Sequence, residues 1–354
     1  MGETKALSTF VPHVRKKYPQ AFIYVTTTTE TGQKEAQKRI PEANAFGYLP
    51  LDFSWVVKKM VRHLRPSLFI LVEGDYWLNL IRAVKKQGGK VNVVSGTLSE
   101  KSLQRYRLFP FFSRLIFGSI DHFCLQEERE KNRFLKLQVS PKRITVTGNL
   151  KYDVPIEPSP SIETLKRHLR LTPKDRVLTL GSIHKGEDAL LYTLLSPLLQ
   201  SDPDLKIVIV PRYPNRFFQT RSWATHPNVH FIDQMGILPT CYHVSDLAIV
   251  GGSFIPGIGG HDIFEPVKMG IPTLYGPHMD QQGSLERMIR KSGAARQVKP
   301  LELASVVSSI LNDLDLHVDM GKKGKHFADQ MKGVALRTWK EVEKRIFLEY
   351  KLKP

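Results

Sequence analysis

The feature that most constrains the fold is a regular alternation of short apolar, β-branched runs with amphipathic stretches of helical periodicity. Runs of this length that are buried on both faces, and that are separated by helices, predict a mostly parallel sheet covered by helices on both sides. The alternation occurs in two series. The apolar runs of the first series lie at residues 21–27, 67–72, 91–95 and 122–125, and those of the second at residues 177–180, 206–210, 230–232, 247–250 and 273–275.

A stretch rich in prolines and turn-forming residues separates the two series at about residues 148–161. Its composition is typical of an interdomain linker, and 354 residues suit two α/β domains of ordinary size. We therefore predict an α/β protein of the GT-B plan, with two doubly wound Rossmann-like domains and a ligand cleft between them. Other two-domain α/β enzymes and periplasmic binding proteins share this plan, so it does not fix a function. The predicted parts are an N-terminal domain at 1–153, a linker at 154–165, a C-terminal domain at 166–330, and a C-terminal helix at 331–354 that packs back on the N-terminal domain.

The charge of the chain is strongly positive and uneven. Of the net +18, residues 1–153 contribute +13, from 26 Lys and Arg against 13 Asp and Glu, and the remainder contributes +5, from 26 against 21. Such a charge attracts nucleic acid or the anionic face of a membrane. The sequence has no zinc-finger, RNA-recognition or helix-turn-helix signature, so a nucleic-acid binder is a rival class without further support, and we expect no nucleic-acid partner. Two distant cysteines, Cys124 and Cys241, indicate no disulfide framework and favour a reducing, cytosolic setting.

The segment from Gly251 to Pro277 carries the strongest local signal for a ligand. Glycines directly after the apolar run at 247–250 let backbone amides approach a phosphate, and the helix that follows offers its N-terminal N–H groups to the same anion. Glu265, one turn into that helix, is placed to accept hydrogen bonds from vicinal ribose hydroxyls. Taken alone, a glycine-rich loop is more often a simple turn, so this signal indicates a phosphate site only weakly.

Polar side chains also follow other apolar runs. Arg212, held by prolines, either binds a phosphate bidentately or belongs to a solvated basic loop. Gly181–Glu187 is a strand-to-helix turn that either binds an anion or caps a helix, and Thr26–Gly32 either binds hydroxyls or ends a strand before a capped helix. Glu73 lies where catalytic groups of open α/β sheets gather, whereas Asp75 is better explained as a helix N-cap.

Taken together, these segments resemble the Kdo transferases, the enzymes that attach 3-deoxy-D-manno-octulosonic acid (Kdo) from CMP-Kdo to the lipid A precursor of Gram-negative lipopolysaccharide. The order and spacing of the family's motifs hold from residue 2 to about residue 340, and so many ordered matches are specific where any one alone is not. The matching segments are Thr26–Gly32, Glu73–Asn79, Thr97–Ser102, Thr147–Asp153, Gly181–Glu187, Pro211–Phe217 and Gly251–Pro277.

The resemblance implies an inverting glycosyltransferase with three catalytic residues. It places the family's general base on Glu3, behind Gly2, and it assigns stabilisation of the transition state to Glu73 and Lys151. By the same comparison the chain begins inside its catalytic motif. We therefore expect the family's first strand and membrane-proximal segment to be missing from the N-terminal, acceptor-binding domain.

The resemblance also implies that the C-terminal domain binds CMP-Kdo. The sequence departs from the family pattern at Tyr213, where the usual residue is His, and at Asp262, where the usual residue is Asn; each change either weakens or retunes nucleotide binding. The residues expected to hold the nucleotide are Pro211, Arg212, Gly236, Ile237, Leu238, Gly252, Ser253, Asp262, Ile263, Phe264 and Glu265.

The expected chemistry needs no metal and no cofactor besides the donor. CMP is a good leaving group, so the reaction requires a base for the incoming hydroxyl and positive charge for the departing phosphate. No cluster of carboxylates or histidines has metal-ligand spacing, and we expect His184 and His261, in separate loops, to be hydrogen-bonding or structural residues.

The implied acceptor is an anionic, bisphosphorylated glycolipid in a membrane, which matches the basic first half of the chain. Lys101–Leu115 interleaves Lys and Arg with aromatic and aliphatic residues, a composition typical of an interfacial segment, although a basic amphipathic helix packed on the sheet is the alternative. We expect the chain at the cytoplasmic face of the bacterial inner membrane, peripheral or anchored through a segment that it lacks. A GT-B transferase or epimerase that uses another nucleotide sugar, such as a UDP-sugar, is the main rival function.

Overall fold

The computed structural model describes residues 2–156, 162–213, 223 and 226–347. The chain divides into two compact units: the first consists of Met1–Val154 and Met331–Pro354, and the second of Pro155–Gln330. The division falls inside the predicted linker at 154–165, of which residues 157–161 lie outside the described residues. Both units are α/β and all of their strand pairs are parallel, so the fold class predicted from the alternating pattern is confirmed.

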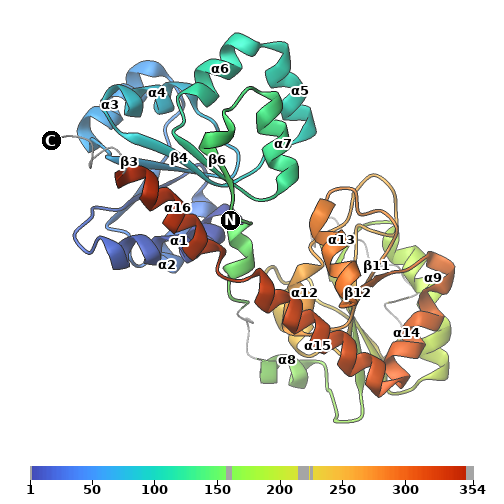
Figure 1. The fold of residues 1–354 in the computed structure, drawn as a ribbon. Coiled ribbons are helices and arrows are strands. Elements are labelled where there is room, and N and C mark those ends of the chain that lie inside the picture. Colours follow the sequence, from blue (N-terminus) through green and yellow to red (C-terminus); the bar gives the residue numbers. More distant parts are fainter. Residues whose placement is uncertain (1, 157–161, 214–222, 224–225, 348–354) are drawn as a thin grey trace. The chain divides into compact units, whose positions relative to one another are not determined.

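The first unit contains two parallel sheets. β1 pairs with β2, and the other sheet has the order β3-β4-β5-β6. Helices connect successive strands and cover the sheets (Figure 1). The elements are α1 (Gly2–Lys17), β1 (Tyr24–Thr27), α2 (Glu30–Arg39), β2 (Ala45–Tyr48), α3 (Ser54–Leu64), β3 (Leu68–Val72), α4 (Leu78–Lys86), β4 (Lys90–Gly96), α5 (Glu100–Leu108), α6 (Pro110–Gly118), β5 (His122–Leu125), α7 (Glu128–Lys136), η1 (Pro141–Arg143), β6 (Ile144–Val146), η2 (Leu150–Asp153) and α16 (Val334–Phe347).

The C-terminal helix α16 packs beside α1 in the first unit (Figure 1). Trp339 of α16 stands edge-on to the ring of Phe10 in α1, with the ring centroids 5.8 Å apart. The carboxylate of Asp153 accepts hydrogen bonds from the backbone N–H groups of Gly333 and Ala335, at 2.7 and 2.6 Å. These bonds satisfy amides at the start of α16, and they tie that helix to the end of η2.

The second unit contains one six-stranded sheet with the order β12-β11-β10-β7-β8-β9. The chain adds β8 and β9 on one side of β7 and then returns to add β10, β11 and β12 on the other side. The topological switch point of this sheet therefore lies between β7 and β10, where folds of this kind bind ligands. The elements are α8 (Ile162–His168), β7 (Arg176–Ile183), α9 (Glu187–Ser201), β8 (Leu205–Pro211), β9 (Val229–Phe231), α11 (Leu238–His243), β10 (Leu247–Val250), α12 (Phe264–Met269), β11 (Thr273–Tyr275), α13 (Gly283–Ser292), β12 (Ala295–Gln297), η4 (Pro300–Glu302), α14 (Leu303–Asn312) and α15 (Leu314–Met331).

The predicted strands are present: β5, β10 and β11 have the predicted bounds and the others have shifted ends. Three further short strands were not predicted. The run at 21–27 forms a strand only at Tyr24–Thr27, and the new strands β2, β6 and β12 have 4, 3 and 3 residues. The helix expected near 101–117 consists of α5 and α6. Pro110 begins α6, and its ring forces Phe109 out of the helical region, to φ −125° and ψ 70°.

Each unit has its own apolar core. Aromatic rings of Phe117, Phe123 and Phe134 pack together in the first unit, whereas aliphatic side chains of β7, β8, β10, α9 and α14 fill the second. Cys124 and Cys241 are buried free thiols, and burial raises the pKa of each to about 12, so both stay protonated. Among the helices that the structure describes, none combines the length and the apolar character needed to span a bilayer.

Candidate functional site

In the first unit, Glu73 occupies a strained turn directly after β3. Its φ of 63° lies in the left-handed region, which costs a residue with a Cβ on the order of 1–3 kcal/mol. Three hydrogen bonds hold this conformation: the Glu73 N–H donates to the carbonyl of Val94, and the Glu73 carbonyl accepts from the Thr97 N–H and the Tyr76 hydroxyl, at 3.0, 3.3 and 3.2 Å. These bonds therefore fix the position of the Glu73 side chain at the carboxyl edge of the sheet.

Lys151 lies against the Glu73 carboxylate. The Lys151 Nζ atom is 2.6 Å from Glu73 Oε1, and the two side chains are 42% and 15% exposed. Oε1 has no aligned hydrogen-bond donor among the described residues, so the contact is a close ion pair. The Asn149 side chain accepts a hydrogen bond from the Lys151 N–H at 2.9 Å, which fixes the start of η2. Residues 73 and 151, which are distant in sequence, thus form one charged centre.

Glu3 joins this centre from the first turn of α1. A Cβ at the preceding Gly2 would lie 3.4 Å from Cε of Lys151, so the start of α1 is beside the Lys151 side chain. Partial burial raises the pKa of the Glu3 carboxyl, the carboxylates of Glu73 and Asp75 raise it further, and Lys151 opposes them. The structure thus brings together all three residues predicted to be catalytic. We call Glu3, Glu73 and Lys151 the acidic-basic cluster; their roles stay predictions.

A network of hydrogen-bonded polar side chains adjoins the acidic-basic cluster. Ser95 has a φ of 52° at the end of β4, and its carbonyl accepts a hydrogen bond from Gln126 Nε2 at 2.9 Å. Gln126 Oε1 in turn accepts from Asn149 Nδ2 at 3.2 Å, and Ser95 Oγ accepts from the Leu150 N–H at 3.3 Å. The sequence analysis missed Ser95 and Gln126, because no motif marks them and only the pairing of β4 with β5 makes them neighbours.

The expectation that Asp75 caps a helix is wrong. Helix α4 begins at Leu78, and its N-cap residue Trp77 makes no side-chain cap. The carboxylate of Asp52 instead accepts from the N–H groups of Asn79 and Leu80, both at 2.9 Å. Because Asp52 lies 27 residues before Asn79, no local sequence pattern predicts this cap. Asp75 is an exposed residue whose charge acts on Glu3.

In the second unit, the glycine-rich turn after β10 surrounds an internal carboxylate. Glu187, the first residue of α9, is 0% exposed. It accepts hydrogen bonds from the N–H groups of Gly252, Ser253 and Phe254, at 2.7, 3.1 and 2.9 Å. The amides of Gly252 and Ser253, which we predicted to hold the nucleotide, therefore already have an acceptor within the chain.

His184 and His261 face each other across the switch point. Their Nε2 atoms are 2.7 Å apart, and their rings stack at 8° with centroids separated by 5.0 Å. Burial lowers the pKa of both imidazoles, and the positive charge of Arg212 lowers both further; the pKa of His261 falls to about 4. Both rings are therefore neutral at pH 7, so one Nε2 donates its proton to the other. They are hydrogen-bonded, as expected, but to each other.

Arg212 and Tyr213 follow β8 beside this pair. The Arg212 N–H donates to the carbonyl of Ile183 at 3.0 Å, and the guanidinium carbon lies 5.7 Å from the centroid of the Tyr213 ring. The Tyr213 ring is edge-on to His184, with centroids 5.8 Å apart. Tyr213, which replaces the usual His, thus still contacts the switch point. The rest of the predicted segment, residues 214–217, lies outside the described residues.

The remaining predicted nucleotide residues lie in two adjoining turns. Gly236 has a φ of 84° ahead of Ile237 and Leu238, at the start of α11. Asp262 Oδ1 accepts from the Phe264 N–H at 2.8 Å and so caps the start of α12, with Glu265 in its first turn. Ile237, Ile263 and Phe264 are 1%, 0% and 4% exposed, so their side chains belong to the core of the second unit.

Comparison with known proteins identifies the family. A family model described as 3-deoxy-D-manno-octulosonic-acid transferase (kdotransferase) matches residues 1–154. The 3-deoxy-D-manno-octulosonic acid transferase of Chlamydia pneumoniae is 31% identical over 366 residues, which cover 98% of this chain and 83% of that protein. The chain belongs to the Kdo transferase family. As a member of that family it is a glycosyltransferase of lipopolysaccharide biosynthesis, which confirms the resemblance read from the motifs.

Solved structures place this Kdo transferase family member in the GT-B fold. A UDP-N-acetylglucosamine 2-epimerase has a TM-score of 0.68 and 16% identity, covering 99% of this chain and 94% of that one. A glycosyltransferase from Rickettsia africae has a TM-score of 0.67 and 14% identity, covering 99% and 95%. Identities this low show a shared fold and leave the choice of nucleotide sugar to the sequence relatives.

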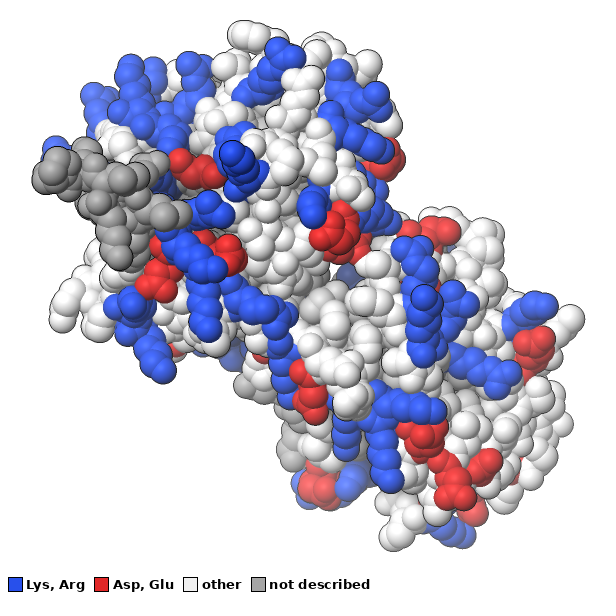
Figure 2. Space-filling model, viewed as in Figure 1, with Lys and Arg blue, Asp and Glu red and all other residues white. Residues whose placement is uncertain are grey.

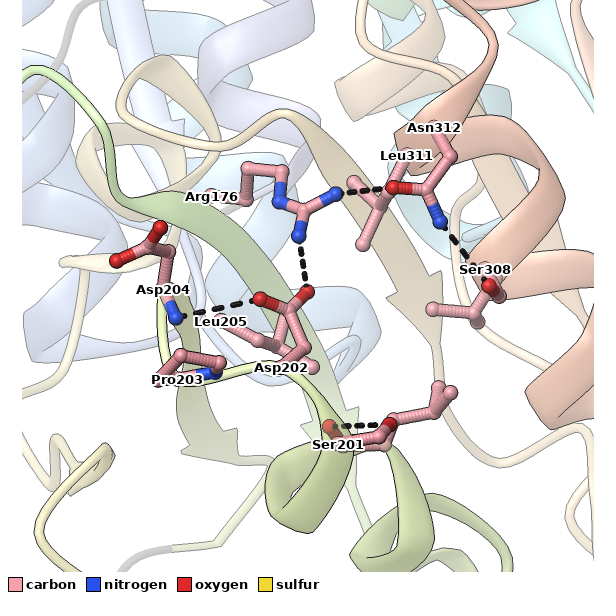
Figure 3. Close-up of a pocket in the computed structure, with 11 residues that line it drawn as sticks. Arg176, Ser201, Asp202, Pro203, Asp204, Leu205, Ser308, Leu311 and Asn312 are labelled. Carbon is pink, nitrogen blue, oxygen red and sulfur yellow. Dashed lines mark hydrogen bonds and ion pairs between the residues drawn. The ribbon is translucent and has the colours of Figure 1, made fainter.

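A cavity of about 360 Å³ lies elsewhere in the second unit, at the amino ends of β7 and β8 (Figure 3). Its guanidinium, from Arg176, donates to Asp202 and Asn312, and Asn312 donates to Ser308 (Figure 3). Arg176, Asp202, Asn312 and Ser308 thus satisfy one another, at the edge of the sheet opposite the switch point. Across the described ranges, no three His, Cys, Asp or Glu side chains group as a metal site would require.

Proposed function

We propose that this family member transfers Kdo from CMP-Kdo to the anionic lipid A precursor, with inversion and without a metal or another cofactor. The observation that carries the proposal is the acidic-basic cluster, in which residues 3, 73 and 151 meet at one place in the first unit. A carboxyl with a raised pKa beside an ion-paired carboxylate is what base-assisted attack by a sugar hydroxyl requires.

In the proposed step, the Glu3 carboxylate takes the proton of the acceptor hydroxyl while that oxygen bonds to the anomeric carbon of Kdo. The bond from that carbon to the phosphate oxygen breaks, and CMP leaves with the electron pair. Glu73 stabilises positive charge that develops at the anomeric carbon, and Lys151 both holds Glu73 and offsets negative charge on the phosphate. A single displacement of this kind inverts the configuration.

The second unit supplies the donor side of the proposal. Arg212 and the turns around Gly236 and Asp262 surround the switch point, with Glu265 as the acceptor for ribose hydroxyls. Two predicted amides, of Gly252 and Ser253, donate to Glu187 instead, so within the second unit the charge on the phosphate is met chiefly by Arg212.

We also propose that the first unit docks on the anionic cytoplasmic face of the inner membrane. Leu108, Phe109 and Phe111, around the break between α5 and α6, are 73%, 67% and 77% exposed. Arg105, Arg107 and Arg114 on the same two helices are exposed beside them. In Figure 2, Lys and Arg stand densely over the part of the first unit where Figure 1 places α3 to α6. Exposed rings with basic neighbours fit the boundary between headgroups and acyl chains.

Donor preference tests the proposal against its main rival. We expect CMP to raise the melting temperature of the chain, because the nucleotide binds only the folded state, whereas UDP and UDP-sugars leave it unchanged. The measurement is thermal unfolding with each nucleotide at the same concentration. Stabilisation by a UDP-sugar and not by CMP would favour the alternative transferase or epimerase.

A further inference from the structure

The buried carboxylate of Glu187 makes hydrogen bonds that none of the roles predicted from the motifs explains. Besides the three amides after β10, its Oε2 atom accepts from the N–H of His184, in the turn after β7, at 3.2 Å. One fully buried carboxylate therefore accepts four backbone hydrogen bonds. These four bonds all come from backbone N–H groups, which satisfy both oxygens of the buried carboxylate.

The carboxylate of Glu187 explains the first glycine of the turn, and the ring of His261 explains the second. A Cβ at Gly251 would lie 2.7 Å from Glu187 Oε2, and a Cβ at Gly252, where φ is 68°, would lie 2.9 Å from the ring of His261. Only glycine allows such close approach. The turn resembles a phosphate-binding loop, but its backbone amides donate to the carboxylate of Glu187.

The consequence is that Glu187 connects three loops at the carboxyl edge of the sheet. It binds the turns after β7 and β10 directly. Ser253, held by Glu187, then accepts the Gly276 N–H on its Oγ atom and the His278 N–H on its carbonyl, at 2.8 and 2.9 Å, which adds the loop after β11. His184, also held by Glu187, meets His261. The carboxylate of Glu187 therefore holds the loops of the switch point together.

We propose that Glu187 is a positioning residue for donor binding: its carboxylate holds the loops of the switch point in the form that accepts CMP-Kdo. This inference rests on the proposed function, because it assumes that the second unit binds the donor. Without the carboxylate, several buried N–H groups lose their acceptor and the loops leave this arrangement. The apparent dissociation constant then rises in proportion to the lost population of the competent form.

The test compares Glu187→Gln with Asp246→Asn. Glutamine has the same shape, but its amide N–H₂ faces two N–H donors and cannot accept from them. Asp246 is the matched control, because its Oδ2 atom accepts the Val177 N–H at 2.7 Å at the opposite, amino edge of the same sheet. Three quantities are measured for the unaltered chain and both variants: amide hydrogen exchange, the dissociation constant for CMP, and kcat and KM for CMP-Kdo.

In Glu187→Gln we expect faster exchange at residues 252–254, a dissociation constant for CMP roughly tenfold or more higher, and a rise in KM that exceeds the fall in kcat. Asp246→Asn is expected to keep the CMP affinity even where its melting temperature falls. The inference would be overturned if Glu187→Gln changed neither the amide exchange at residues 252–254 nor the affinity for CMP, or changed only one of them. It would also be overturned if both variants lost the same affinity for CMP. An unaltered chain that binds no CMP would instead refute the proposed function, and the inference with it.

Discussion

Glu3 is the base of the proposed mechanism, and it can be replaced without changing the shape of the site. Glu3→Gln cannot accept a proton, so we expect kcat to fall by about 10²–10⁴-fold, the usual contribution of a general base. The affinity for CMP should not change, because the predicted nucleotide residues belong to the second unit. Single-turnover rates and CMP titration measure the two effects separately. A kcat close to that of the unaltered chain would contradict the role.

Asp75 influences the pH at which that base works. Its negative charge raises the pKa of Glu3, so Asp75→Asn should lower that pKa. A base acts only when deprotonated, and the rate therefore falls as the pH drops through its pKa. We expect the acid limb of the kcat/KM profile to move to lower pH in Asp75→Asn and to stay in place in Asp315→Asn, a change in the second unit. A shift to higher pH would be incompatible with Glu3 as the base.

Glu73 combines a functional side chain with an unfavourable backbone. At a φ of 63° a Cβ is strained and glycine is not, so Glu73→Gly should be about 1 kcal/mol more stable to unfolding than Glu73→Ala. Both variants lose the carboxylate and the ion pair with Lys151, and both should lose most of their activity. Chemical denaturation of the two variants measures the difference. Equal stabilities would mean that the turn relaxes and stores no strain.

At the scale of elements, the two helices α5 and α6 carry the proposed membrane contact. Replacing Arg105, Arg107 and Arg114 by Gln should weaken binding to vesicles that contain anionic lipid, since each basic side chain near such a surface contributes about 1 kcal/mol. Co-sedimentation with vesicles measures the effect. The charge-matched control replaces Lys166, Arg167 and Lys174, exposed residues of the second unit. Unchanged vesicle binding in the first variant would remove α5 and α6 from the proposal.

The sequence predicted the buried strands and missed strands that are largely half-buried or exposed: β5, β10 and β11 have the predicted bounds, whereas β2, β6 and β12 were not predicted. Strands such as β7, with 8 residues buried almost throughout, carry a clear apolar run, whereas β2 has 4 residues, none of them buried. The break at Pro110 was visible in principle, because the residue before a proline rarely adopts helical geometry. Basic residues are interleaved with apolar ones on both sides of Pro110, so the overall pattern predicted one continuous helix.

For the sites, the motifs indicated which residues matter but not how they pair. Glu187 lies 65 residues before Gly252, and only the placement of β10 next to β7 brings them together. The same is true of His184 and His261, and of Asp52 with α4. A glycine-rich turn predicts that something anionic approaches its amides. It does not tell whether that anion is a phosphate or a carboxylate of the chain itself.

At the scale of the whole molecule, the two units divide the chemistry. The acidic-basic cluster belongs entirely to the first unit, and the switch point with its predicted nucleotide residues belongs to the second. The GT-B fold is shared with a UDP-N-acetylglucosamine 2-epimerase at 16% identity, so the fold itself is compatible with several donors. Membership of the Kdo transferase family, together with the cluster, directs the proposal to Kdo transfer.

The most direct test of that claim is incubation of the chain with CMP-Kdo and the tetra-acylated lipid A precursor, followed by mass spectrometry of the lipid. We predict a lipid heavier by one or more Kdo residues, formed in the presence of a chelator and formed about 10²–10⁴-fold more slowly by Glu3→Gln. A lipid that gains no Kdo from a folded chain that binds CMP would contradict the account, as would a product that forms at the same rate without the Glu3 carboxylate.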